Sequence, residues 1–490
     1  MRWEGRQEVG ASHTTYEAGE LLPEDPVEGR GCRIIEPLER NMASASKLTT
    51  VSTKLQRIAE LARQSPEMGF TSLAYLIDMD WLREAHRRTR KDGAVGVDGQ
   101  TAEMYAVNLE ENLRSLHDCA KSGTYKAPPV RRAYIPKGTG HETRPIGLPT
   151  FEDKILQRAV AMALEAIYEQ DFLDCSYGFR PRRSAHQALE SLRNQIMEMR
   201  GGWIVELDIR KFFDTMVHAH LRTFLRQRVR DGVLNRLIGK WLNAGVLEAG
   251  QVTYPEDGSP QGGVISPLLS NVYLHYVLDI WFEREVQPRM RGRAFLIRYA
   301  DDVVLGFARE DDAKRVLDVL PKRFSRFGLA LHPTKTCMIE FCPPSQKDSK
   351  IYTNSPPRRN SFDLLGFTHY WARSRRGYWV VKRRTSCERL RRSLCAVNQW
   401  CRKHRHAKVQ HQHRMLVAKL RGHYAYYGIT GNAEALQRFR YAVGRIWKKW
   451  LCRRSHRAYI DWPRFDKLLG RYPLPRPQVV HSVYRPVAKR

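Results

Sequence analysis

Residues 295–306 read Phe295-Leu296-Ile297-Arg298-Tyr299-Ala300-Asp301-Asp302-Val303-Val304-Leu305-Gly306, with two adjacent aspartates between two short apolar runs. Residues 294–298 and 303–307 are rich in β-branched and apolar side chains without helical period, so each predicts a strand. A hairpin would carry both aspartates at its tip. Carboxylates beside an apolar sheet are costly unless a cation neutralises them, and Mg²⁺ is the expected cation. The alternative is an ordinary Asp-Asp hairpin turn.

A second carboxylate ends another predicted strand. Residues 203–208 are largely apolar and end in Asp208. Asp208 and Asp301 lie far apart in the sequence, so only tertiary folding can bring them together. Two-metal phosphoryl transfer requires carboxylates that converge on two ions about 3.5–4 Å apart. The pair therefore predicts a phosphoryl-transfer site, while for Asp208 alone a helix N-cap is the alternative.

Further sequence blocks stand in a fixed order around these carboxylates. The blocks are Arg132-Ala133-Tyr134-Ile135-Pro136-Lys137, Thr143-Arg144-Pro145-Ile146-Gly147-Leu148, Ser176-Tyr177-Gly178-Phe179-Arg180-Pro181, Gly258-Ser259-Pro260-Gln261-Gly262-Gly263-Val264-Ile265-Ser266-Pro267, Gly328-Leu329-Ala330-Leu331-His332-Pro333-Thr334-Lys335 and Leu364-Leu365-Gly366-Phe367. From about residue 50 to 470 the chain resembles the bacterial group II intron-encoded proteins, which are reverse transcriptases with maturase activity. The sequence of residues 261–267 is the form typical of the intron-encoded reverse transcriptases.

The resemblance implies an α+β fold of the right-hand polymerase class, with fingers, a palm built on an antiparallel sheet, and a helical thumb. The expected parts are a disordered extension at 1–45, fingers with a template-covering extension at 46–200, a palm at 201–370, a helical thumb or maturase domain X at 371–465, and a basic tail at 466–490. Residues 1–45 lack periodicity and carry nine acidic against five basic residues, which supports the expected disorder.

The resemblance also implies roles for single residues. Asp208 and Asp301 are expected to hold two Mg²⁺ ions, with Asp302 as a third catalytic carboxylate. The expected contacts to the incoming dNTP come from Lys137, Arg144, Phe213, Gln261 and Lys335. The expected contacts to the primer come from Tyr299, Ala300 and Gly366. Alternatives stay open for three of these residues: Lys137 and Arg144 could bind template backbone, and Phe213, the expected sugar gate, could be core packing.

The composition points to a polyanionic partner. The net charge is +31, and residues 371–490 hold 31 Lys or Arg against four Asp or Glu. The nine cysteines are scattered without a C-x-x-C pair, which favours neither a zinc ribbon nor a disulfide framework. No apolar run approaches the 18 residues of a membrane span, and no signal-peptide pattern is present. The clustered histidines at 404–413 lie in a basic run, where a solvated helical face is favoured over a metal site.

A helical pattern in the basic region predicts an RNA-binding face. Apolar residues from Leu436 to Trp450 recur at helical spacing, and basic residues fall on the opposite side. The residues expected to bind RNA are Arg438, Arg445, Lys448 and Lys449. The alternative is a surface helix without a partner.

Together these features predict an RNA-directed DNA polymerase that binds its group II intron RNA, assists splicing and copies the intron during mobility. Expected partners are intron RNA, an RNA template with DNA primer, a DNA target and dNTPs; a homodimer is left open. The expected location is the bacterial cytoplasm, in a nucleoid-associated ribonucleoprotein. The sequence after Cys452 contains no cysteine, so we expect the type without an HNH endonuclease. The alternatives are a splicing factor without polymerase activity and a domesticated reverse transcriptase in defence or repair.

Overall fold

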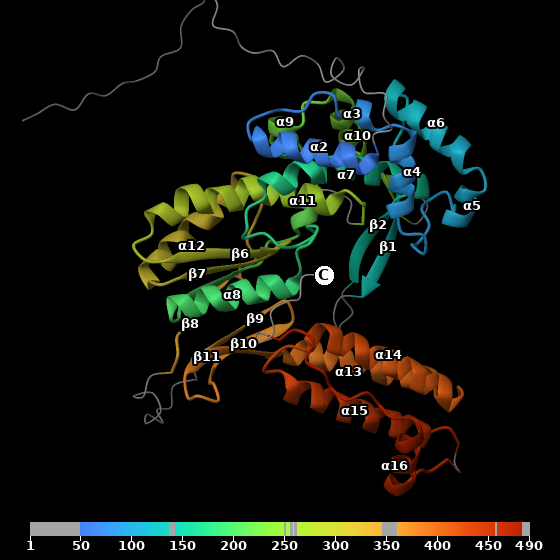
Figure 1. The fold of residues 1–490 in the computed structure, drawn as a ribbon, viewed down its shortest axis with the longest axis vertical. Helices are drawn as coiled ribbons and strands as arrows, with labels where there is room; N and C mark the ends of the chain where they lie inside the picture. The colour runs from blue at the N-terminus through green and yellow to red at the C-terminus, as the bar shows by residue number, and fades with distance from the viewer. Residues whose placement is uncertain are drawn as a thin grey trace, which may run out of the picture. The chain divides into compact units, whose positions relative to one another are not determined.

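The computed structural model describes residues 50–136, 143–248, 251–254, 258, 262–344, 360–455 and 458–482. The predicted disorder at 1–45 and the predicted site residues Lys137 and Gln261 lie outside these ranges. Helices pack around three small sheets (Figure 1), so the α+β class predicted from the sequence is confirmed. Across the described ranges, no helix combines the length and apolar character needed to cross a bilayer.

One four-stranded sheet, with strand order β6-β7-β3-β8, carries the predicted carboxylates. Its strands are β3 (Gly202–Leu207), β6 (Ala294–Tyr299), β7 (Asp302–Phe307) and β8 (Cys337–Phe341), and all neighbours are antiparallel. The predicted strands at 203–208, 294–298 and 303–307 are thereby confirmed, with β3 ending at Leu207, one residue before the predicted end. β6 and β7 are buried along nearly their whole length, which explains why their sequences are continuously apolar rather than alternating.

Helices α8 (Ala185–Met199) and α12 (Glu310–Ser325) pack against this sheet (Figure 1). α8 begins where the Ser184 side chain accepts a hydrogen bond from the Gln187 backbone N–H, the usual N-cap arrangement. Its buried residues recur at helical spacing and join the core beneath the sheet: Ala188, Leu189, Leu192 and Ile196.

A buried helix begins within the sequence block that starts at Gly258. α11 (Ser266–Leu274) is buried on almost every side and continues through the π-helical turns η2 (His275–Asp279) and η3 (Phe282–Val286) to the short η4 (Gln287–Arg289). Because α11 is buried, the polar residues that it and η2 carry must find partners inside the protein.

The N-terminal half forms a helical layer with a second small sheet. The helices are α2 (Val51–Gln64), α3 (Leu73–Leu76), α4 (Met79–Arg88), α5 (Ala102–Ala106), α6 (Leu109–Ser122), α7 (Phe151–Asp171), α9 (His218–Arg228) and α10 (Gly232–Leu242). The sheet has the order β2-β1-β4-β5, from β1 (Val130–Pro136), β2 (Thr143–Leu148), β4 (Val246–Glu248) and β5 (Gln251–Thr253). Buried Arg228 ties α9 to α2 by donating to the carbonyls of Ala62 and Ser65 and to Asp171.

The C-terminal part joins a three-stranded sheet to a helical bundle. The strands are β9 (Ser361–Leu364), β10 (Phe367–Arg373) and β11 (Trp379–Thr385); the helices are α13 (Cys387–Lys403), α14 (Val409–Tyr427), α15 (Ala433–Leu451) and α16 (Trp462–Arg471). The bundle has its own apolar core, centred on Leu416, Phe439 and Trp447. The predicted boundary between palm and thumb at residue 370 lies within β10. The predicted boundary between thumb and tail at residue 465 lies within α16.

Candidate polymerase active site

Strand register brings the predicted carboxylates to one edge of the β6-β7-β3-β8 sheet. β3 is antiparallel to β7, and Leu207 lies opposite Val303. Continuing that register by one residue places Asp208 opposite Asp302. Residues opposite each other in an antiparallel pair have Cα atoms about 4.5–5.5 Å apart and point to the same face. Asp301 is next to Asp302 at the hairpin tip, so three carboxylates from distant segments lie at the same sheet edge.

The hairpin tip is tight and closely backed. Tyr299 lies opposite Asp302, and Ala300 adopts a left-handed φ of 59° in the turn between them. Gly178 packs directly on this turn, because a Cβ on Gly178 would lie 2.3 Å from the Ala300 backbone nitrogen. Ala300 is itself buried. The small residues at 178 and 300 therefore let two backbones meet where the carboxylates emerge.

The carboxylates influence one another electrostatically. Burial, together with the negative charges of Asp301 and Asp208, raises the pKa of Asp302 to about 6, although part of the residue is exposed to solvent. Arg389 and Arg144 act in the opposite direction on the same pKa. Like charges that raise a carboxyl pKa are typical of sites that take up cations.

Lys335 already supplies one positive charge to this edge. Its Nζ lies 3.0 Å from Oδ2 of Asp208. The structure thus joins two residues that the sequence analysis assigned to the same site. Within the described part of the chain, no three or more His, Cys, Asp or Glu side chains already stand as a metal-binding group. The donors nevertheless fit a divalent cation in kind, because hard ions prefer carboxylate oxygens.

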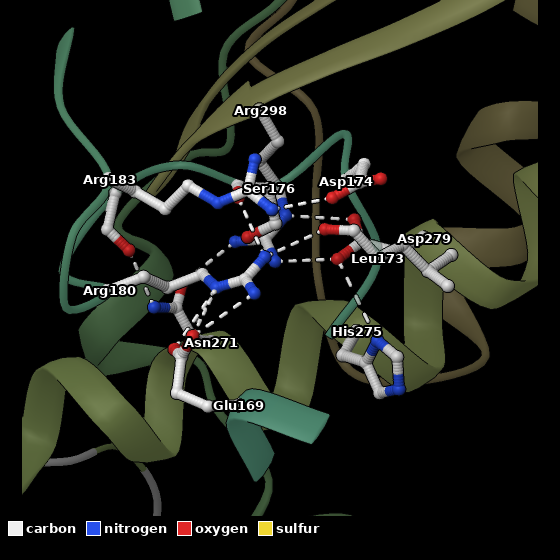
Figure 2. Close-up of polar contacts among 11 residues, drawn as sticks. Glu169, Leu173, Asp174, Ser176, Arg180, Arg183, Asn271, His275, Asp279 and Arg298 are labelled. Atoms are coloured by element: carbon white, nitrogen blue, oxygen red, sulfur yellow. Dashed lines mark hydrogen bonds and ion pairs between the residues drawn. The ribbon is translucent and has the colours of Figure 1, made fainter. Parts of the chain in front are cut away.

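A buried arginine that sequence reasoning missed supports the hairpin (Figure 2). Arg298 on β6 is fully buried, and its guanidinium donates to both carboxylate oxygens of Asp279 at 2.8 and 2.6 Å. It also donates to the Asn271 side-chain oxygen at 2.8 Å and to the Ala300 carbonyl at 3.2 Å. The last bond reaches the residue before Asp301. An arginine inside an otherwise apolar strand was the available sequence signal for this ion pair.

The same network holds the loop that backs the hairpin. Asn271 donates to the Gly178 carbonyl at 2.7 Å. Arg180 donates to the carbonyls of Leu173 and Ser176 and pairs with Glu169 (Figure 2). The loop also extends the β6 edge, because Tyr177 donates its backbone N–H to the Arg298 carbonyl at 2.9 Å. α11 and η2 therefore hold the β6–β7 hairpin through buried polar contacts.

His275 contributes to this network as a neutral group. Its Nδ1 lies 4.0 Å from Asp279 (Figure 2). Burial lowers the pKa of His275 to about 4, even though the charge of Asp279 acts to raise it. At neutral pH the charge of Asp279 is consequently balanced by Arg298 and not by His275.

Of the residues predicted to contact the nucleotide, some are described by the structure and others are not. Arg144 lies on β2 opposite Ile135, and its charge acts on Asp302. Phe213 is half-buried in η1 (Phe212–Asp214) and packs edge-on against buried Phe212, with ring centroids 5.3 Å apart. A partly exposed ring leaves both the sugar-gate and the packing interpretation in place. Lys137 and Gln261 lie outside the described residues.

Near Gly366, which the sequence analysis assigned to the primer, the structure adds two residues from the helical bundle. Gly366 has a φ of +81° in the turn between β9 and β10, and a Cβ there would lie 3.0 Å from the Tyr427 hydroxyl oxygen and 3.2 Å from Cγ of Arg389. Tyr426 donates its hydroxyl to the Leu365 carbonyl at 2.8 Å. Arg389 and Tyr426 also interact electrostatically with Asp302, which their position far along the sequence did not reveal.

The predicted RNA-binding residues lie on α15, whose apolar face is buried as expected. Arg445 and Lys449 are exposed. Arg438 is exposed but paired with Glu434 at 2.5 Å. Lys448 is half-buried, with its ammonium 4.8 Å from the Trp462 ring centroid. The four residues are therefore not equivalent.

Comparison with known proteins agrees with this geometry. The family model described as reverse transcriptase (RNA-dependent DNA polymerase) matches residues 135–369. The chain is 37% identical over 287 residues to protein YkfC of Escherichia coli K12, covering 52% of this chain and 75% of that protein. It is 35% identical over 280 residues to the group II intron-encoded protein LtrA of Lactococcus lactis, covering 55% of this chain and 46% of LtrA. Nuclear intron maturase 4 of Arabidopsis thaliana is 31% identical over 194 residues, covering 39% and 23% of the two chains.

Proposed function

This chain belongs to the group II intron-encoded reverse transcriptases and maturases, and we propose that it copies its intron RNA into DNA and assists the splicing of that RNA. The family consists of RNA-directed DNA polymerases with a right-hand α+β fold, which bind intron RNA and template–primer nucleic acid and use a divalent metal. The observation that carries the proposal for this chain is the meeting of Asp208, Asp301 and Asp302 at one sheet edge.

We propose Mg²⁺, as two ions, for the metal at this edge, with Asp208 and Asp301 as its ligands and Asp302 beside them. Bound Mg²⁺ would stabilise negative charge on the primer hydroxyl and on the leaving pyrophosphate. Arg298 holds the hairpin through the Ala300 carbonyl, so the carboxylates present fixed oxygens. Lys335 would balance the charge of Asp208 or contact the phosphates of the nucleotide.

The incoming dNTP would lie against the β2 strand and η1. Arg144 supplies a guanidinium that suits phosphate oxygens, and its charge already acts on Asp302. Lys137 and Gln261 are proposed for the same nucleotide from their sequence blocks. Phe213 would lie beneath the sugar and exclude a 2′-hydroxyl. Its partial exposure next to buried Phe212 supports this role.

The primer end would lie between the hairpin and the helical bundle. Tyr299 and Ala300 flank the catalytic aspartates, and Gly366 leaves backbone open to a primer strand beside Arg389. RNA outside the catalytic site would be held by α15, chiefly through exposed Arg445 and Lys449. During intron mobility the chain would also bind a DNA target. A homodimer stays a prediction.

Asp301→Ala tests whether DNA synthesis and intron RNA binding depend on different residues. It removes one carboxylate at the hairpin tip and changes nothing on α15, so DNA synthesis on a primed RNA template should fall by orders of magnitude. Intron RNA affinity should stay within about twofold. Primer extension with dNTPs and Mg²⁺, and filter binding, are measured on one preparation. If the wild-type protein does not extend several primer–template pairs, the chain is a splicing factor rather than a polymerase.

A further inference from the structure

A second basic site lies between α9 and α10, away from the catalytic sheet. A groove of about 690 Å³ runs between these helices and is lined by four arginines: Arg222, Arg226, Arg230 and Arg236. Among the described residues, none that lines the groove is acidic. α9 and α10 lie beside α2 and α3 in Figure 1, and backbone pairing of Phe70 with Val229 holds them there. The groove is therefore built from other elements than α15 and the carboxylate edge.

The arginines are concentrated without compensating charge. Arg222 and Arg226 are four residues apart on α9, which places like charges next to each other at a cost in stability, and Arg230 follows in the connection to α10. Within the ranges that the structure describes, no carboxylate forms an ion pair or a side-chain hydrogen bond with any of the four. The nearby Asp231 is buried, and its carboxylate accepts from the backbone N–H groups of Ala74, Val233 and Leu234.

Glycines leave the floor of the groove open. Gly232 and Gly239 both line it; they are seven residues apart and therefore lie on the same face of α10. An ideal Cβ on Gly239 would lie 3.6 Å from a terminal guanidinium nitrogen of Arg222, so this arginine of α9 reaches across to α10. Arg226, Arg230 and Arg236 line the same groove and are exposed, with the side chain of Arg230 also packed on Gly69.

The groove continues into a second cavity of about 480 Å³. The two cavities share Arg236 and Gly239, and the second adds exposed Lys126. Tyr254 stands at this end with 73% of its surface exposed. A basic track that ends at an exposed aromatic ring is the arrangement by which proteins follow a phosphate backbone and stack an unpaired base.

We propose that the α9–α10 groove binds the phosphate backbone of a structured RNA segment while the polymerase site holds template and primer. Planar guanidinium groups pair bidentately with phosphate oxygens, and several of them in one groove match a polyanion better than a single small anion. The choice of RNA over other polyanions rests on the proposed function, since intron RNA is the structured partner of this family. The site would anchor intron RNA independently of copying.

The test measures RNA binding with the polymerase site already filled. An excess of unlabelled primer–template, with a dideoxy-terminated primer and the next dNTP, occupies that site. A labelled RNA hairpin of about 20 base pairs then reports on the remaining surface by filter binding over a salt series. In R222Q/R226Q/R230Q/R236Q we expect hairpin affinity to fall at least tenfold. The slope of log affinity against log salt should fall by about 0.7–0.9 for each phosphate that the variant no longer binds.

A matched control removes four positive charges elsewhere. R289Q/R293Q/R309Q/K314Q changes residues already paired with carboxylates, and should leave hairpin affinity within about twofold. Unimpaired primer extension by the groove variant would show that its fold is intact and would separate this site from the proposed polymerase function. Unchanged hairpin affinity, or an equal loss in the control, overturns the proposal. A DNA hairpin of the same sequence that binds equally well overturns the assignment to RNA.

A measurement on the wild-type protein covers the case in which the fourfold variant does not fold. Phenylglyoxal modifies accessible arginines, and mass spectrometry locates them. The RNA hairpin should protect Arg222, Arg226, Arg230 and Arg236 while Arg289 and Arg309 stay reactive. Groove arginines that react equally with and without the hairpin contradict the proposal.

Discussion

At the scale of single residues, Arg298 supports the turn that carries the proposed catalytic carboxylates. Its guanidinium connects Asp279, Asn271 and the Ala300 carbonyl inside the protein. Burying this ion pair costs desolvation, so its contribution to stability is small compared with an apolar replacement. The role of Arg298 is better explained as positioning, because its bond to the Ala300 carbonyl fixes the residue before Asp301.

A paired replacement separates stability from positioning. Asp279→Ala alone leaves a buried arginine without its counter-ion and should lower the free energy of unfolding by about 3–5 kcal/mol. R298M/D279L removes both charges, so most of that stability should return. Primer extension should stay at least tenfold below wild type, because the Ala300 carbonyl has lost its donor. Denaturant unfolding and primer extension are compared; full recovery of synthesis in the paired variant would make the network purely structural.

At the scale of elements, the β6–β7 hairpin depends on a loop from another part of the chain. Gly178 touches the Ala300 backbone so closely that any side chain there must displace the turn. The hairpin sequence alone contains no sign of this neighbour. Strand β10 likewise depends on its neighbour β9. His369 of β10 is fully buried and stacks on Phe362 of β9, with ring centroids 4.7 Å apart.

Gly178→Ala should move the hairpin and reduce primer extension, by about 100-fold for a shift near 1 Å. Gly422→Ala is the matched control, because no described atom lies within 4 Å of the added Cβ on α14. That control should keep full activity and gain up to about 1 kcal/mol in stability. Steady-state extension rates of the two variants are compared, and equal rates would mean that the turn tolerates displacement.

His369 makes stability depend on pH. Burial, and secondarily the charge of Arg383, lowers the pKa of His369 from 6.5 to about 3. Between these values the unfolded chain binds the proton and the folded protein does not. The free energy of unfolding therefore falls with acidification, by up to about 1.4 kcal/mol per pH unit from this group. His369→Phe lacks this contribution and should gain stability relative to wild type as pH drops from 7.5 to 5. An equal difference at both pH values would contradict this origin.

At the scale of the whole molecule, the described residues carry basic side chains on more than one surface. The α15 residues and the α9–α10 groove are built from different elements. Such a distribution suits a large folded RNA that contacts the protein at several places, whereas the proposed catalytic edge would bind one primer end. RNA affinity and DNA synthesis should therefore respond to different substitutions.

Within α15, the environment of each residue predicts unequal effects on RNA binding. R445Q/K449Q removes two exposed charges and should lower the salt slope of intron RNA binding by about 0.7–0.9 for each phosphate released. Adding Arg438→Gln should change little, because Glu434 already pairs with Arg438. Filter binding over a salt series compares the double and triple variants. A large further loss in the triple variant would show that Arg438 leaves Glu434 to bind RNA.

The sequence by itself determined the local elements and the chemistry of the site. The apolar runs before Asp208 and on either side of Asp301 and Asp302 defined strands, because strand pattern and turn residues are local properties. The ordered blocks identified the family, and helical spacing defined the buried face of α15. These features require no knowledge of which segments meet.

Only the tertiary structure decided which groups act together. The register of β3 against β7 put Asp208 opposite Asp302, and packing selected Asp279 and Asn271 as the partners of Arg298. It also brought Arg389 from the helical bundle to the carboxylates and gathered four arginines in one groove. Such pairings join residues from distant segments, and their energies depend on burial and distance, which a linear pattern does not contain.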